Sequence, residues 1–158
     1  MLYWKTNVIN FLGKNKYQDL SELMFAYKKG KNISKLLRSF ESKIENIIEI
    51  SYDLQSGSYI EFMNENEEVC NKYIECIIEI IQPHLSINDT VIDCGTGEMT
   101  TFAPVMSNLN FKEAYNFDIS LSRILTGINF LSNYSENLQK KTKSFVANID
   151  AIPLPDNS

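Results

Sequence analysis

The stretch Val91–Thr100, VIDCGTGEMT, sets an acid and two glycines directly behind a short apolar run. Asp93 follows the apolar residues, and Gly95 and Gly97 come next. A β-branched run that turns through glycines into a segment of helical length predicts a strand, a tight loop and a helix. Glycines let a ligand approach the backbone closely, and N–H groups at the next helix start face it. The stretch therefore predicts a site for a nucleotide-like ligand at the end of a strand.

Three short runs rich in β-branched and aromatic residues follow Ser86, and segments of helical length separate them. The runs are TVIDC at 90–94, AYNFDI at 114–119 and KSFVANI at 143–149. An alternation of strand, helix, strand, helix and strand is typical of parallel βαβ units. We therefore expect an α/β domain with about three parallel strands and their helices.

The first 85 residues carry apolar side chains at helical spacing and predict a helical N-terminal region. We expect helices over 21–30, over 32–50 and from residue 59 to about residue 82, where a proline follows. The segment 51–58, SYDLQSGS, breaks this periodicity with a glycine and polar residues, and predicts a loop. Its polar and aromatic side chains are candidates for closing over a ligand: Tyr52, Gln55, Ser56 and Tyr59.

The acids near the glycines indicate which kind of ligand the loop would accept. Asp93 lies two residues before Gly95, where a carboxylate disfavours an anionic pyrophosphate and favours a cation such as a sulfonium. Asp118 ends the second predicted strand, 21 residues beyond Gly97. In nucleotide-binding βαβ folds, an acid at about this spacing binds the ribose hydroxyl groups. Read singly, either acid is an ordinary turn or helix cap.

The arrangement DCGTGE, residues 93–98, at the end of an apolar strand resembles motif I of class I S-adenosylmethionine-dependent methyltransferases. Residues 90–158 resemble the N-terminal portion of this family, and in particular its small-molecule group called methyltransferase type 11. The resemblance implies a Rossmann-like fold and S-adenosylmethionine as the cofactor. It also implies that Asp93, Gly95, Gly97 and Asp118 bind this cofactor.

The end of the chain resembles the segment after the third strand of the same family. In VANIDAIPLPDNS, the resemblance implies that Asn148 and Ile149 contact the adenine. Two positions depart from the family pattern, since Met99 replaces the third glycine of motif I and Asn148 replaces an acid. The amide oxygen of Asn148 can still accept a hydrogen bond from the adenine amino group.

The resemblance implies a seven-stranded sheet, and the runs described above supply three of its strands. We therefore expect an N-terminal portion of a longer enzyme, truncated after strand three and inactive by itself. Residues 1–85 would form a helical lid region, and residues 86–158 would form the first half of the cofactor-binding domain. The strand at 90–94 would be an uncovered edge, which predicts self-association.

The acceptor and the catalytic base are less well determined by the sequence. Residues 1–43 carry nine Lys or Arg against three acids, which suits an anionic small molecule such as a sugar or surface-polysaccharide precursor. A quinone precursor or another metabolite is the alternative. His84 is the single histidine and the only visible candidate base, but its place beside Pro83 favours a structural or solvent-facing role. The catalytic residue is therefore unassigned.

Two other functions fit the same residues. A non-catalytic methyltransferase-like binding or scaffold module would keep the fold, although retention of the glycines and both acids favours an enzyme. An NAD(P)-binding Rossmann domain would use a G-x-G-x-x-G pattern, but the third glycine position of that pattern holds Thr100.

Composition excludes several classes. A net charge of −5 and a pI of about 4.9 lack the basic footprint of a nucleic-acid-binding protein. No apolar run is long enough to span a membrane and no signal-peptide pattern begins the chain, so we expect a cytoplasmic protein without membrane insertion. Three cysteines without C-x-x-C spacing, together with one histidine, argue against a metal site: Cys70, Cys76 and Cys94.

Overall fold

The computed structural model describes residues 23, 25–38 and 44–155. Their contacts divide the chain into two compact units. One unit is Met1–Ser56 together with Ser120–Ser122, and the other is Gly57–Ile119 together with Arg123–Ser158. No helix among the described residues is long and apolar enough to cross a membrane.

The first unit is helical in its described part. It contains α3 (Ile33–Leu37) and α4 (Ile44–Leu54). Asn32 caps α3 by accepting a hydrogen bond from the N–H of Lys35 at 3.0 Å. A small apolar core joins these helices with the preceding helical turn: Leu23, Ala26, Ile33, Leu37, Ile47 and Ile50. The middle of the helix predicted over 32–50 lies outside the described residues.

The predicted loop over 51–58 is wrong for its first half, because α4 continues to Leu54. The hydroxyl of Ser51 donates to the carbonyl of Ile47 at 2.6 Å, one helical turn back. This local bond lets a polar residue remain in a helix, and Ser51 is buried. The chain turns only at residues 55–57, and Gly57 adopts a positive φ of 99° there.

The second unit begins with two helices where the sequence predicted one. These are α5 (Ser58–Glu65) and α6 (Glu67–Ile81), and a short 3₁₀ turn η1 (Gln82–His84) follows. Asn66 separates them with φ −127° and ψ 39°, outside the helical region. The break redirects the chain, so α6 can pack Ile74 into the core of this unit.

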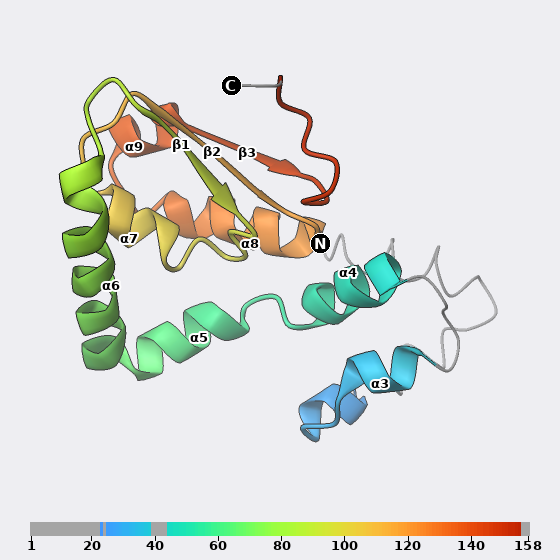
Figure 1. The fold of residues 1–158 in the computed structure, drawn as a ribbon. Helices are drawn as coiled ribbons and strands as arrows, with labels where there is room; N and C mark the ends of the chain where they lie inside the picture. The colour runs from blue at the N-terminus through green and yellow to red at the C-terminus, as the bar shows by residue number, and fades with distance from the viewer. Residues whose placement is uncertain (1–22, 24, 39–43, 156–158) are drawn as a thin grey trace. The chain divides into compact units, whose positions relative to one another are not determined.

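The sheet consists of three parallel strands in the order β1 (Thr90–Cys94), β2 (Glu113–Asp118) and β3 (Thr142–Val146) (Figure 1). The helices α7 (Phe102–Met106), α8 (Leu121–Leu131) and α9 (Glu136–Lys141) lie between them in sequence. The predicted α/β class with three parallel strands is therefore confirmed. Within the described sheet, β1 is an edge strand, as expected, and 39% of Ile92 is exposed. Self-association through this edge stays a prediction, as does a lid role for residues 1–85.

The core of the second unit lies on one side of the sheet. Figure 1 shows α7 and α8 on this same side. Phe111, Ala114 and Leu138 contribute to the core from the strands and their connections, together with side chains from α7 and α8: Phe102, Ala103, Val105, Met106, Ile124 and Leu131. On the opposite side, the rings of Phe117 and Phe145 stack at 5.6 Å between centroids.

Gly127 in α8 provides the room that the glycine loop needs. A Cβ at this position would lie 2.9 Å from Cγ of Met99 and 3.1 Å from the carbonyl carbon of Glu98. Ordinarily, Gly→Ala inside a helix stabilises a protein by about 1 kcal/mol. Here we expect Gly127→Ala to lower the free energy of unfolding by about 1–2 kcal/mol, because overpacking outweighs helix propensity. Urea denaturation measures this change.

Two companion variants test the steric explanation. Asn129→Ala is an exposed position in the same helix and should leave the free energy of unfolding nearly unchanged or raise it. Met99→Ala removes the Cγ that the new Cβ would meet, so Gly127→Ala should cost less in that background. Equal costs in both backgrounds would contradict the explanation.

Candidate functional site

The two sequence motifs meet at the carboxyl edge of the sheet. Parallel register pairs Asp93 with Asn116, so β1 and β2 end side by side. The N–H of Gly97 donates to Oδ2 of Asp118 at 3.0 Å, although 21 residues separate them. Asp118 is buried. The acid predicted to bind ribose therefore lies directly against the glycine loop.

The loop backbone is left-handed at three positions. Gly95 has φ 77° and Gly97 has φ 56°, and Met99 has φ 59°. Met99 is the only non-glycine residue with positive φ in the described part of the chain, and it stands where the family pattern has its third glycine. A left-handed residue with a side chain costs about 1–2 kcal/mol. Complete burial of the Met99 side chain, whose Sδ lies 3.5 Å from Nδ2 of Asn116, offsets this cost.

Most backbone N–H groups of the loop bond within the protein. Gly95 and Thr96 both donate to the carbonyl of Phe117 at 2.9 Å, and Gly97 donates to Asp118. Met99 donates to the carbonyl of Thr96 at 3.0 Å. A dinucleotide site needs such N–H groups to hold its pyrophosphate. This geometry, with two carboxylates beside the loop, is a poor site for an anion.

Asp93 carries an unfavourable charge in the folded protein. Burial raises the pKa of its carboxyl above the ordinary value of 3.8, and the negative charge of Asp118 adds to the increase. The nearby Thr96 side chain opposes the shift by stabilising the charged form of the carboxyl. A cationic ligand at this place would remove part of the penalty. Electrostatics thus favours a positively charged group at the end of β1.

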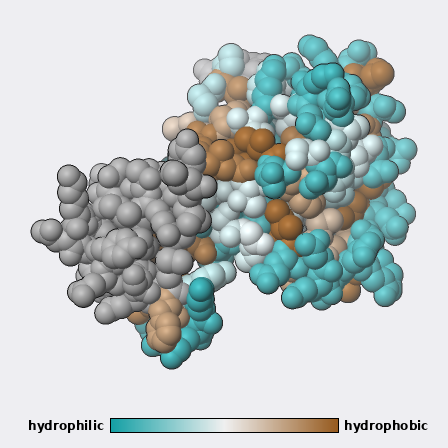
Figure 2. Space-filling view, turned by 180° about the vertical axis from the view of Figure 1, so that it is seen from behind, coloured by the Kyte–Doolittle hydropathy of each residue, from teal (hydrophilic) through white to brown (hydrophobic). Residues whose placement is uncertain are grey.

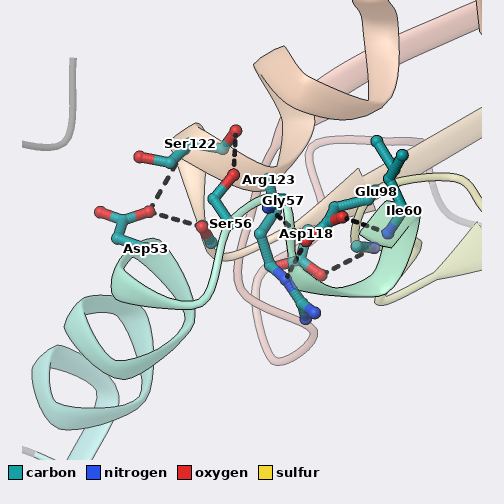
Figure 3. Close-up of polar contacts among 10 residues, drawn as sticks. Asp53, Ser56, Gly57, Ile60, Glu98, Asp118, Ser122 and Arg123 are labelled. Carbon is teal, nitrogen blue, oxygen red and sulfur yellow. Dashed lines mark hydrogen bonds and ion pairs between the residues drawn. The ribbon is translucent and has the colours of Figure 1, made fainter. Parts of the chain in front are cut away.

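Glu98 is the functional-site residue that the sequence did not identify. Its carboxylate accepts from the N–H of Gly57 at 2.8 Å and from the N–H of Ile60 at 3.1 Å (Figure 3). Only 2% of Glu98 is exposed. Gly57 precedes α5 and has no side chain to cap it, so Glu98 supplies the acceptors from a distant segment. The second acid of the loop therefore binds the start of helix α5.

Arg123 balances the buried charge of Glu98. Its Nε lies 3.7 Å from Oε1 of Glu98, and 8% of its side chain is exposed. The guanidinium also lies 4.6 Å from the ring centroid of Tyr59. The guanidinium lies next to Gly97, where a Cβ would be in ordinary van der Waals contact with Nη1 at 3.5 Å. The loop, α5 and the start of α8 are joined through these charged groups.

A third buried carboxylate, Asp53, belongs to the first unit. Asp53 accepts hydrogen bonds from the hydroxyl of Ser120 and from the N–H of Ser122, and 2% of it is exposed (Figure 3). Ser56 donates from its hydroxyl to the carbonyl of Ser122 at 3.1 Å. Of the four residues predicted to close over a ligand, Ser56 thus holds a structural hydrogen bond. The closing role itself stays a prediction.

The remaining predicted residues lie near the end of β3 or away from the site. The Oδ1 atom of Asn148 accepts from the N–H of Asp150 at 3.2 Å, which closes a local turn. Ile149 is exposed. Contact of either residue with adenine stays a prediction. His84 is exposed in η1, before β1 begins.

Solved structures similar to the chain include several methyltransferases. Geranyl diphosphate C-methyltransferase from Streptomyces coelicolor matches 58% of this chain and 33% of its own, with 15% identity and a TM-score of 0.47. A proposed methyltransferase from Haloferax volcanii, solved with a methyltransferase activator, matches 65% and 40%, with 17% identity and a TM-score of 0.47. The YcgJ protein from Bacillus subtilis matches 56% and 35%, with 17% identity and a TM-score of 0.46.

The chain spans between about a third and two fifths of the length of these solved structures. Comparison with family models and with curated proteins finds no match. Activity has to be argued from the residues of this chain.

Removing one acceptor from Glu98 should destabilise the second unit. In Glu98→Gln, the amide NH₂ would face the N–H of either Gly57 or Ile60, and Arg123 would lose its counter-charge. We expect the free energy of unfolding to fall by about 2–4 kcal/mol in urea denaturation. The exposed Glu61 in the first turn of α5 provides the control, since Glu61→Gln should cost less than about 1 kcal/mol. Equal costs would show that Glu98 has no capping role.

The raised pKa of Asp93 predicts a pH-dependent effect of removing its charge. Between the ordinary and the raised pKa, the folded state binds more protons than the unfolded state, so this residue lowers stability as pH rises. Asp93→Asn removes that penalty. The free energy of unfolding of the variant, minus that of the wild type, should therefore increase between about pH 3.5 and pH 7. A difference that stays constant over this range would contradict the raised pKa.

Proposed function

We propose that this chain binds S-adenosylmethionine at the carboxyl edge of its sheet, as part of a methyltransferase that acts on a small molecule. The observation that carries the proposal is the hydrogen bond from Gly97 to Asp118, which brings both predicted motifs together. The resembled family binds its cofactor at these positions. Carboxylates and internally bonded loop N–H groups favour this cationic ligand over a dinucleotide.

Each of these residues would contact a different part of the cofactor. Asp118, at the end of β2, would accept hydrogen bonds from the ribose hydroxyl groups. Asp93 would face the positively charged part of the ligand, and Gly95, which is exposed, would let it approach the backbone. Asn148 and Ile149, after β3, would lie against the adenine. S-adenosylmethionine supplies an activated methyl group, so the protein would mainly orient the two reactants.

The next point is the class of molecule that would accept the methyl group. Nothing in the described part of the chain supports a sugar or polysaccharide precursor. The basic residues that suggested such a precursor lie in the segment 1–43, and most of this segment is outside the described residues. A small-molecule acceptor remains the proposal, with the base unassigned. A non-catalytic module would bind the cofactor equally well, so a binding measurement tests the site and a transfer assay tests the enzyme.

The cofactor proposal predicts a specific loss of affinity in Asp118 variants. Asp118→Asn keeps an acceptor for the N–H of Gly97 but loses the charge, while Asp118→Ala removes both. In calorimetric titration with S-adenosylmethionine, we expect Asp118→Ala to weaken binding by about 2–3 kcal/mol, and Asp118→Asn by less. NADH should not bind the wild-type chain measurably.

A control at the other end of β1 separates this effect from general damage. Asp89 accepts from the N–H of Ser86 at 2.7 Å, before the strand begins. Asp89→Asn should leave affinity for S-adenosylmethionine unchanged. Unchanged affinity in both Asp118 variants would disprove the ribose assignment, and tighter binding of NADH than of S-adenosylmethionine would favour a dinucleotide domain.

A further inference from the structure

A pocket of about 240 Å³ lies within the second unit, beside the glycine loop. Its walls come from α5, α6 and the two residues before α7, and all eight lining residues are uncharged. They are Tyr59, Phe62, Met63, Cys70, Tyr73, Ile74, Thr100 and Thr101. Apolar pockets with a few polar groups are the usual form of small-molecule sites.

Helical spacing explains how the two helices build the pocket. On α5, Tyr59, Phe62 and Met63 follow the i, i+3, i+4 pattern of a single helix face. Cys70, Tyr73 and Ile74 repeat the same pattern on α6. The break at Asn66 folds one helix relative to the other, so both faces line the same space.

The rings that line the pocket are unusually accessible for aromatic residues. About half or more of each is exposed: 50% of Tyr59, 54% of Phe62 and 59% of Tyr73. Figure 2 shows that hydrophobic surface reaches solvent in patches among hydrophilic residues. Clustered exposed apolar side chains mark binding sites more often than single ones do. Burial of three rings by one ligand would contribute substantially to its affinity.

Helix α5, which forms one wall of the pocket, is held in place without a ligand. Glu98 fixes the start of α5 through the N–H groups of Gly57 and Ile60. The guanidinium of Arg123 lies against the ring of Tyr59. A preorganised site loses less conformational entropy on binding. The pocket is therefore a built feature of the second unit.

We propose that this pocket binds a neutral small molecule that contains an aromatic or alicyclic ring. An apolar cavity of about 150 Å³ already accepts benzene, so this larger pocket suits a substituted or bicyclic ring. A charged group would lose its hydration without gaining an ionic partner from the lining residues. Thr100 and Thr101 are the lining residues on one wall and both carry hydroxyl groups, which suits a ring that carries a hydroxyl.

The pocket lies next to the glycine loop, and this position suggests what its ligand does. The inference rests on the function proposed above. Thr100 and Thr101 follow Gly97 by three and four residues, so the pocket adjoins the loop assigned to S-adenosylmethionine. The ring-containing molecule would then be the methyl acceptor. A nucleophilic substituent on that ring would form a bond to the methyl carbon as the methyl–sulfur bond breaks, which leaves S-adenosylhomocysteine as a neutral thioether. The proton of the substituent would pass to solvent water.

A matched pair of probes tests the pocket. The probe 2-naphthol is neutral, contains a bicyclic ring and fluoresces, and 2-naphthyl phosphate adds two negative charges to the same ring. We expect saturable binding of 2-naphthol to the chain, and binding of the phosphate weaker by about tenfold or more. Absence of saturable 2-naphthol binding, or tighter binding of the phosphate, overturns the proposal.

Substitutions of the lining residues test whether 2-naphthol binds in this pocket. Phe62→Ala and Tyr73→Ala each remove one wall and should weaken 2-naphthol binding by about tenfold. Cys70→Phe fills the space instead and should abolish binding, which keeps the test valid if a wall variant does not fold. Ile80→Ala changes an exposed apolar residue of α6 that does not line the pocket, and should bind as the wild type does. Equal effects of Ile80→Ala and Phe62→Ala would refute the location.

The cofactor titration separates the two proposals. Binding of 2-naphthol that responds to the pocket variants, in a chain that does not bind S-adenosylmethionine, would confirm the pocket and refute the acceptor role. Binding of S-adenosylmethionine without binding of 2-naphthol would refute the pocket and leave the cofactor site standing.

Discussion

The buried carboxylate of Glu98 is the constraint on which the second unit depends. A charge with 2% exposure must have its hydrogen bonds and its counter-charge in place, because an unpaired buried charge is strongly destabilising. The N–H groups of Gly57 and Ile60 meet the first requirement, and Arg123 meets the second. The glycine loop, the first turn of α5 and the start of α8 consequently form a single arrangement. Loss of one partner would affect all three.

Local signals predicted the strands well. The β-branched run TVIDC matches β1 residue for residue, and the other two runs overlap β2 and β3 over most of their length. The helix boundaries at Leu54 and Asn66 were not predicted. The first depends on the hydrogen bond that Ser51 makes to Ile47, and the second on one residue that leaves the helical region. The spacing of apolar residues along the sequence indicates neither this hydrogen bond nor the backbone conformation of Asn66.

In the candidate site, too, some residues could be predicted from the sequence and others could not. Asp93 and Asp118 could be placed together from sequence, because parallel strands end at a common edge. Glu98 and Arg123 could not, since their roles arise from segments about 40 and 25 residues apart. One signal was present, because Gly57 begins a helix without a capping side chain and its helix must find an acceptor elsewhere. That signal does not say which acid supplies the acceptor.

The distribution of hydrogen bonds explains what the loop can recognise. Four of its N–H groups, those of Gly95, Thr96, Gly97 and Met99, bond to Phe117, Asp118 and Thr96, so these backbone donors contribute little to a ligand at this edge. Asp93 remains partly buried with a raised pKa, which lowers stability unless a cation lies nearby. Selection for stability alone would replace such a residue with a neutral one. Its presence beside a loop whose N–H donors mostly bond within the protein is therefore the physical argument for the proposal that a positively charged ligand binds at this edge of the sheet.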